Sequence, residues 1–203
     1  KTSQASPGAL KEVFNHALKS ADAVLAILIS SGVSQTFNSA NVAKADMPGA
    51  QIEVVDSRMI AMAMGFICIA AAKAAAEGKS LAEVKKLAED SIAKVGVVFV
   101  VDTLDYLHRG GRIGGAQRFI GNTLNVKPVL ELRDGRVEPL ERVRTKKKAV
   151  DYMIGYIADR VAGKSRLQLA TLHADAEAEA RELLDTASKR LNPVETVLTE
   201  VSP

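Results

Sequence analysis

The sequence predicts an α/β protein made of two domains with mostly parallel sheets. Continuous apolar runs, suited to strands that are covered on both faces, alternate with segments whose apolar residues recur at helical spacing. This alternation predicts parallel strands joined by right-handed crossovers. Apolar residues make up 47% of the 203 residues, enough for a sizeable core. After Asp102 a glycine-rich segment at 109–115 interrupts the alternation of strands and helices. We therefore expect two domains, at 1–95 and 96–203.

The first domain is expected to begin with a helix at Ser6-Pro7, because a serine caps a helix and a proline suits the first helical position. The run 23–29 (AVLAILI) is typical of a buried strand. The further elements expected are, in order, a helix at 34–45, a strand at 52–55, a long apolar helix capped by Asp56-Ser57, a helix from Ser80 to about residue 94, and a strand at 97–101.

The segment 59–72 carries no charged residue over 14 positions. A membrane span needs about 20 apolar residues, so this segment is too short to be one. Because it is apolar on every side at helical length, we interpret it as a helix buried all round or as the wall of an apolar cavity. Both interpretations stay open.

The second domain is expected to contain a hairpin at 128–140, because an alternation of period two surrounds Asp134-Gly135, a favoured two-residue turn. The other expected elements are a short helix through Leu104 and Leu107, a helix ending near residue 124, a helix at 145–162, a strand at 167–172, a helix at 175–191 and a strand at 194–201.

The segment 30–34, which we call the serine loop, follows the first strand and opens a helix. Free backbone amides and the positive end of the helix dipole meet at such a place, and Gly32 allows close approach of the backbone. Ser30, Ser31 and Ser34 add uncharged donors. The loop is therefore suited to a carboxylate or a phosphate. The alternative is that Ser34 only caps its own helix.

The sequence shows neither a nucleotide site nor a metal site. Gly78-Lys79-Ser80 and Gly163-Lys164-Ser165 each lack the earlier glycine that a P-loop requires. The three histidines and the single cysteine lie far apart, without the spacing of a zinc set. We therefore expect no metal ligand and no catalytic residue. Cys68, alone in an apolar run, indicates a buried thiol in a reducing compartment, and we expect a cytoplasmic protein.

Two groups of basic residues, at 142–148 and at 109–112, could serve as binding surfaces. The run 142–148 does not favour nucleic acid, because the net charge is only +3 and tryptophan is absent, so we interpret it as a solvated helix start or a surface for protein docking. Arg109 and Arg112 differ, since paired glycines frame them. That loop can bring two guanidinium groups to a phosphate or an acidic partner.

Several short segments follow one another in an order and spacing that match a known family. They are 2–7 (TSQASP), 29–34 (ISSGVS), 55–57 (VDS), 101–107 (VDTLDYL) with 110–113 (GGRI), 125–130 (NVKPVL) and 134–135 (DG). Together they closely resemble the DegV family over essentially the whole chain. Any one of these motifs alone would be weak, and their joint order makes the resemblance specific.

The resemblance implies a bacterial two-domain α/β protein that holds one long-chain fatty acid between its domains, the FakB-like role in phospholipid synthesis. A separate fatty acid kinase subunit would phosphorylate the carboxylate, so the protein itself would be a lipid-binding subunit without a cofactor. By position, Thr2 and Ser34 match residues that bind the carboxylate, and Ser30, Ser31 and Gly32 complete the loop. Arg109 and Arg112 fall in the phosphate-facing or kinase-facing region. A transient contact with a membrane surface is compatible with this role.

The chain also departs from the family pattern. The family begins with a strand and an Asp-Ser-type motif before the Thr-Ser-Gln segment, and it ends with a glycine-rich strand and a histidine near the carboxylate. The resemblance implies that these terminal segments are missing here, so the histidine contact has no counterpart. Asp105 and Ala5 replace a common glutamate and a common proline. Two other functions remain open: a lipid-sensing regulator that binds proteins through 142–148, and a self-contained transferase.

Overall fold

Helices and strands alternate along most of the chain in the computed structural model of the protein, which describes residues 4–120 and 126–201. The helices are α1 (Pro7–Ala17), α2 (Thr36–Ala45), α3 (Ala61–Ala76), α4 (Leu81–Ile92), α5 (Asp105–Arg109), α6 (Lys146–Val161) and α7 (Glu177–Leu191), with a 3-10 helix η1 (Gly114–Phe119). The strands are β1 (Val24–Leu28), β2 (Ile52–Asp56), β3 (Val98–Val100), β4 (Lys127–Arg133), β5 (Arg136–Val143), β6 (Gln168–His173) and β7 (Glu195–Glu200).

Contacts divide the chain into two units that are not continuous in sequence. The first unit is Lys1–Val97 together with Leu132–Arg136, and the second is Val98–Glu131 together with Val137–Pro203. The turn between β4 and β5 therefore belongs to the unit that contains β1 and β2. No helix in the described ranges 4–120 and 126–201 is long and apolar enough to cross a membrane.

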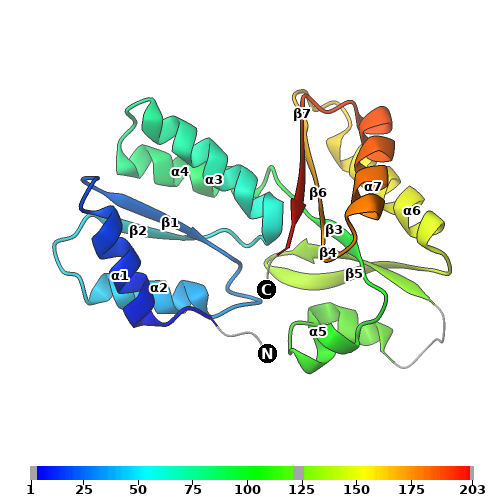
Figure 1. Ribbon diagram of the computed structural model, residues 1–203, viewed down its shortest axis with the longest axis horizontal. Coiled ribbons are helices and arrows are strands. Elements are labelled where there is room, and N and C mark those ends of the chain that lie inside the picture. Colours follow the sequence, from blue (N-terminus) through cyan, green and yellow to red (C-terminus); the bar gives the residue numbers. More distant parts are fainter. Residues whose placement is uncertain (1–3, 121–125, 202–203) are drawn as a thin grey trace. The chain divides into compact units, whose positions relative to one another are not determined.

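In the first unit, β1 and β2 form a parallel pair that runs in register from Val24↔Ile52 to Leu28↔Asp56. Helices α1 and α2 cover one face of this pair, and α3 and α4 cover the other (Figure 1). Alternate residues of β1 serve the two faces: Val24 packs with the α1–α2 cluster and Leu25 with the α3–α4 cluster. Coverage on both faces explains why β1 is a continuous apolar run.

Side-chain caps set the starts of several helices, as the sequence predicts. The Ser6 hydroxyl accepts a hydrogen bond from the Ala9 amide at 3.2 Å, with Pro7 in the first turn. Ser80 and Glu83 form a reciprocal capping box at the start of α4, and Thr145 caps α6. These contacts satisfy amides that a helix start leaves without a partner inside the helix.

Helix α3 differs from the expected element in two ways. It begins at Ala61 without a side-chain cap, so the prediction that Asp56-Ser57 caps it was wrong. Its buried residues lie on one stripe, at Ala63, Ile67, Ala71 and Ala74, while Ile69 is 36% exposed, so the helix is not buried all round. Small residues on this stripe let α3 approach α4 closely, where Val84 and Ala88 are also buried. The half-buried thiol of Cys68 has a pKa raised by desolvation.

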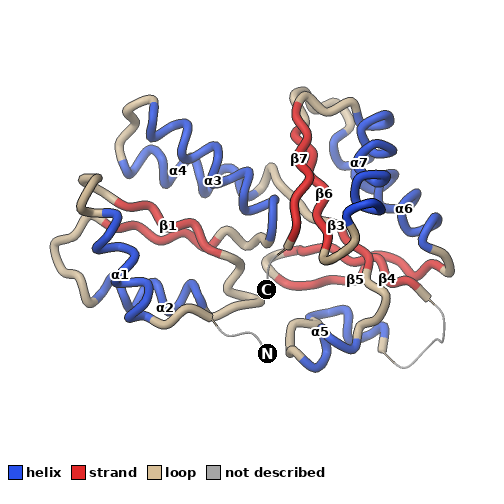
Figure 2. Tube along the Cα trace, viewed as in Figure 1, coloured by secondary structure: helices blue, strands red, loops and turns tan. Residues whose placement is uncertain are grey.

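In the second unit, β3, β4 and β5 form a three-stranded sheet, and β6 and β7 form a separate parallel pair (Figure 2). Strand β3 pairs antiparallel with β4, so the parallel pairing expected from the alternation was wrong for the strand predicted at 97–101. The helix expected to end near residue 124 is the short η1, and residues 121–125 lie outside the described residues. The alternation of strands and helices along the sequence does not reveal the pairing partner of a short strand such as β3.

The predicted hairpin is confirmed around Asp134 and Gly135. Both residues have positive φ angles, 50° and 79°. Two successive residues of positive φ match the twist of an antiparallel hairpin, and aspartate and glycine tolerate this conformation better than most residues. The turn is therefore short and rigid, which matters for the site described below.

One surface ion-pair cluster leads to a pH prediction. The Glu53 carboxylate binds the Lys85 ammonium at 2.9 Å and the Lys44 ammonium at 3.2 Å. Hydrogen bonds from Lys85 and then Lys44 lower the pKa of Glu53 below its ordinary value of 4.5. This contribution is fully present above that ordinary value and is lost as the pH falls through the lowered value, because protonation removes the negative charge.

We expect Glu53→Gln to lower the free energy of unfolding by about 0.5 to 1 kcal/mol at pH 7 and to have no effect at the acid limit. Urea unfolding of both proteins measures this difference across pH values of roughly 3 to 7, which span the ordinary pKa values of carboxyl groups. Glu12→Gln, an exposed change on α1, is the control. An offset between wild type and Glu53→Gln that does not vary with pH would contradict the expectation.

Candidate functional site

The serine loop and the segment after β2 lie at the same edge of the parallel pair, because Leu28 and Asp56 are in register. Backbone hydrogen bonds join the two segments: the Ser30 amide donates to the Met59 carbonyl at 2.9 Å, and the Ser57 amide donates to the Leu28 carbonyl at 3.0 Å. The carboxyl edge of parallel strands is where open α/β sheets commonly bind ligands.

The Asp56 carboxylate accepts hydrogen bonds from donors of the serine loop that the sequence suggested for a ligand. The amide and hydroxyl of Ser31 donate to it at 3.2 and 2.5 Å, and the Arg58 amide donates at 2.9 Å. The loop therefore does bind a carboxylate, but this one belongs to the chain itself. Sequence reasoning missed Asp56 as a member of the site, although its place at the end of the neighbouring strand was a signal.

Ser30 is fully buried and contacts the hairpin turn. Its hydroxyl donates to the Gly135 carbonyl at 2.7 Å and accepts from the Gly32 amide at 3.2 Å. The approach is so close that a Cβ atom on Gly32 would lie 2.3 Å from the Gly135 carbonyl oxygen. Nothing local in the sequence indicates this contact, since 105 positions separate Ser30 from Gly135.

Ser34 is partly buried, and its side-chain hydrogen bonds to described residues are local. Its hydroxyl lies 2.9 Å from the Thr36 hydroxyl and accepts from the Thr36 amide at 3.3 Å. Helix α2 begins at Thr36, with Gln35 at the position where a cap would stand. Ser34 thus accepts a hydrogen bond from the first residue of α2 without standing at the N-cap position itself, and among residues 4–120 and 126–201 its hydroxyl bonds no buried acceptor. Thr2 lies outside the described residues.

A polar hollow of about 360 Å³ adjoins the loop within the first unit. Its walls are Ser30–Gly32, Asp56 with Arg58, and the turn 134–136. Arg58 and Arg136 are exposed at this hollow. Ser34 is not part of its lining. The polar lining suits a charged group rather than an acyl chain.

Arg109 and Arg112 lie in the second unit, on the exposed turn that ends α5. Gly111 has a φ of +70°, which allows the chain to reverse there, and the Arg112 amide donates to the Leu107 carbonyl at 2.9 Å. The Arg112 guanidinium also donates to the Gly110 carbonyl. Both side chains are exposed, so both guanidinium groups are presented to solvent from one short turn.

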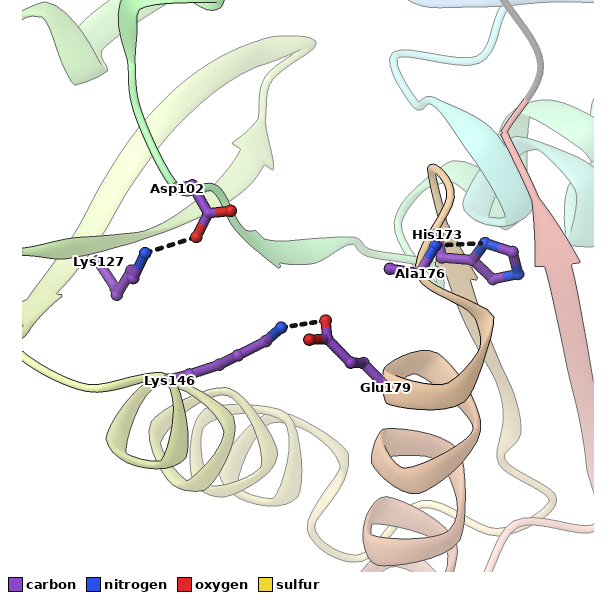
Figure 3. A network of polar contacts seen from close by, with 6 residues as sticks. All are labelled: Asp102, Lys127, Lys146, His173, Ala176 and Glu179. Carbon is purple, nitrogen blue, oxygen red and sulfur yellow. Dashed lines mark hydrogen bonds and ion pairs between the residues drawn. The ribbon is translucent and has the colours of Figure 1, made fainter.

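The basic run 142–148 is partly engaged in contacts inside the second unit. The Arg142 guanidinium stacks on the Phe119 ring, 4.1 Å from its centroid, and Lys146 forms an ion pair with Glu179 (Figure 3). In the same view, Lys127 binds Asp102 at 2.5 Å and thereby lowers the pKa of that carboxyl group. The ion pair between Lys146 and Glu179 reduces the free positive charge of the run 142–148.

His173 ends β6 near this polar cluster. Its Nδ1 atom accepts a hydrogen bond from the Ala176 amide at 3.4 Å (Figure 3). Among the described residues, no group of three or more histidine, cysteine, aspartate or glutamate side chains is arranged to hold a metal ion.

The fold and the loop define an α/β protein whose polar loops gather at the carboxyl edge of a parallel pair of strands. The family model described as "uncharacterised protein, DegV family" matches residues 1–203. The chain belongs to the DegV family, which confirms the resemblance.

Relatives and solved structures agree with this assignment. A DegV domain-containing protein of Clostridium acetobutylicum is 37% identical over 100% of this chain and 72% of its own length. A DegV family protein from Thermus thermophilus, described as fatty acid-binding, has a TM-score of 0.85 and 36% identity over 98% of this chain and 71% of its own. DegV of Bacillus subtilis, described as a fatty acid-binding protein, has a TM-score of 0.87 and 34% identity, with the same coverage of 98% and 71%.

Proposed function

We propose that the protein binds one long-chain fatty acid in a tunnel between its domains, 1–95 and 96–203, and presents the carboxylate to a separate fatty acid kinase. Membership of the DegV family is the observation that carries this proposal, because the similar proteins of Thermus thermophilus and Bacillus subtilis are described as fatty acid-binding. The serine loop, with its uncharged donors at the edge of a parallel pair, supports it independently.

Ser34 is the central residue of the proposed carboxylate site, together with Thr2. In the part of the chain that the structure describes, the Ser34 hydroxyl is partnered by the neighbouring Thr36, so it can turn to a ligand without leaving a described buried acceptor unpaired. Ser30, Ser31 and Gly32 complete the loop. An ionised carboxylate without donors beside an apolar tail would cost several kcal/mol, so the head group needs a donor such as the Ser34 hydroxyl for orientation.

Burial of the acyl tail supplies the affinity in this proposal. A tail of about 14 methylenes would gain on the order of 11 kcal/mol by simple transfer, at about 0.8 kcal/mol each. Ordering costs and the usual ceiling near 0.3 kcal/mol per heavy atom reduce this to roughly 5 to 6 kcal/mol. That range corresponds to a dissociation constant of roughly 40 to 200 micromolar.

The proposed chemistry belongs to the kinase partner. A carboxylate oxygen of the fatty acid attacks the γ-phosphorus of ATP, a new O–P bond forms, and the bond to the bridging oxygen breaks so that ADP leaves. The product is an acyl phosphate. Arg109 and Arg112, exposed on one turn, have the charge and geometry to face the phosphate or an acidic surface of the kinase.

Two measurements test the proposal. Native mass spectrometry of the purified protein should show a co-purified mass that matches one long-chain fatty acid, and titration with such an acid should saturate at one site. ATP consumption should require an added kinase subunit. Absence of fatty acid binding would overturn the proposal, and ATP turnover by the chain alone would instead favour the self-contained transferase.

A further inference from the structure

We propose that Ser30 and Gly135 form a latch that fixes the serine loop in its ligand-binding conformation, so that Ser30 is a positioning residue. This inference rests on the proposed binding of a fatty acid carboxylate. It assigns a task to the turn between β4 and β5, which lies far from the loop in sequence and belongs to the same unit.

The contacts of Ser30 lead directly from the turn to Ser34. On one side, the Ser30 hydroxyl donates to the Gly135 carbonyl at 2.7 Å. On the other side, the Ser30 carbonyl accepts from the amides of Val33 and Ser34, each at 3.1 Å. Ser30 is 0% exposed, so its hydroxyl cannot exchange the Gly135 carbonyl for water at no cost. The position of the Ser34 backbone therefore depends on the turn.

The two glycines of the latch are packed too closely to accept a side chain. A Cβ atom on Gly32 would meet the Gly135 carbonyl oxygen at 2.3 Å, and a Cβ atom on Gly135 would meet the Ser30 hydroxyl at 2.6 Å. Two successive residues of positive φ form the turn, a conformation that suits a tight two-residue hairpin. Such a turn packed against the loop restricts the conformations that the loop can adopt.

Asp56 supplies a second anchor one residue further along. It holds the amide and the hydroxyl of Ser31, as described above. With Ser30 and Ser31 both bonded within the chain, the loop is ordered before the ligand arrives. A donor that is already in place avoids an ordering cost on binding, so the latch should favour ligands that use the donors of the loop.

The decisive experiment compares two ligands of equal chain length, a saturated fatty acid and the corresponding primary alcohol. In Ser30→Ala, we expect the affinity for the acid to fall by about 5- to 10-fold, the range for one hydrogen bond that positions a charged partner, and the affinity for the alcohol to change by less than about 2-fold. A merely structural role would weaken both ligands equally. Equal weakening, or no weakening, would therefore overturn the latch.

A matched control is Ser91→Ala, which removes a hydroxyl-to-carbonyl hydrogen bond of the same length, 2.7 Å, to Leu87 in the same unit. It should leave both affinities unchanged. If Ser30→Ala does not fold, Ser30→Cys keeps the shape of the side chain with a larger sulfur atom and a weaker donor, and the same comparison of ligands applies. Wild type that binds neither ligand would refute the proposed function, whereas a variant that keeps the wild-type preference for the acid would refute only the latch.

A double-mutant cycle tests whether Ser30 and Gly135 act together. Gly135→Ala alone should weaken acid binding, because its Cβ crowds the Ser30 hydroxyl. In the double variant Ser30→Ala with Gly135→Ala, the hydroxyl is gone, so the combined loss should be smaller than the product of the two single losses. Multiplicative losses would show that the two residues act independently and would contradict the latch.

Discussion

Replacing Ser34 by alanine is expected to weaken binding of a long-chain fatty acid by about 10- to 100-fold, the range for loss of a hydrogen bond to a charged group. Among the described residues, the partner of this hydroxyl is Thr36, so of the serine-loop side chains it is the one freest to turn toward a ligand. Titration of both proteins with the same fatty acid, by calorimetry or by competition with a fluorescent analogue, measures the change. An unchanged affinity would remove Ser34 from the site.

Ser80→Ala is the matched control for Ser34→Ala. It removes a serine hydroxyl from another helix start of the same unit, where Ser80 and Glu83 form the capping box of α4. The loss of this cap should lower the free energy of unfolding by about 1 kcal/mol and leave fatty acid affinity at the wild-type value. Weakened binding in both variants would point to general destabilisation of the unit rather than to a lost donor.

Gly32→Ala is expected to have the largest effect on the fold around the site. The new Cβ atom would lie 2.3 Å from the carbonyl oxygen and 3.0 Å from the carbonyl carbon of Gly135. Both are backbone atoms of a tight turn, so neither can move aside without breaking the hydrogen bond to Ser30. We expect the free energy of unfolding to fall by about 2 to 3 kcal/mol, as for other overpacked sites.

Fatty acid binding should be lost together with this stability, because the loop and the turn can no longer both keep their positions. Urea unfolding and ligand titration on the same preparation measure the two effects. Gly96→Ala is the control, since a Cβ atom at Gly96 has no neighbour within 4 Å. If Gly32→Ala and Gly96→Ala behave alike, the close contact between loop and turn is not a constraint on this protein.

Elements that depend on neighbouring residues were predictable from the sequence. Ser6 and Ser80 cap helices where the pattern indicates, because a cap is a contact over three positions. The hairpin around Asp134-Gly135 formed as expected, because the turn residues set its backbone angles. The apolar run at 23–29 forms β1, half-buried between helices on both faces, as such a run in a covered strand predicts.

Predictions failed where a residue had two partners to choose between. Asp56 and Ser57 were expected to cap the next helix, yet the Asp56 carboxylate bonds Ser31 and the Ser57 hydroxyl bonds Met59. The Asp56 carboxylate bonds both across the edge of the strands, to Ser31, and along its own chain, to the Arg58 amide, rather than to the start of α3. The sequence likewise could not reveal that β3 pairs antiparallel with β4, since strand pairing depends on segments brought together by folding.

Hydrophobic periodicity, turn chemistry and helix caps act over a few residues, and they were enough to predict the α/β class and the polar loop after β1. The assignment of individual donors within that loop depended on folding. Ser31 bonds a partner 25 positions away and Ser30 a partner 105 positions away, whereas the bond of the Ser34 hydroxyl within the described residues is local. Hydrogen bonds between distant segments carry no local pattern, because their geometry exists only after the chain has packed.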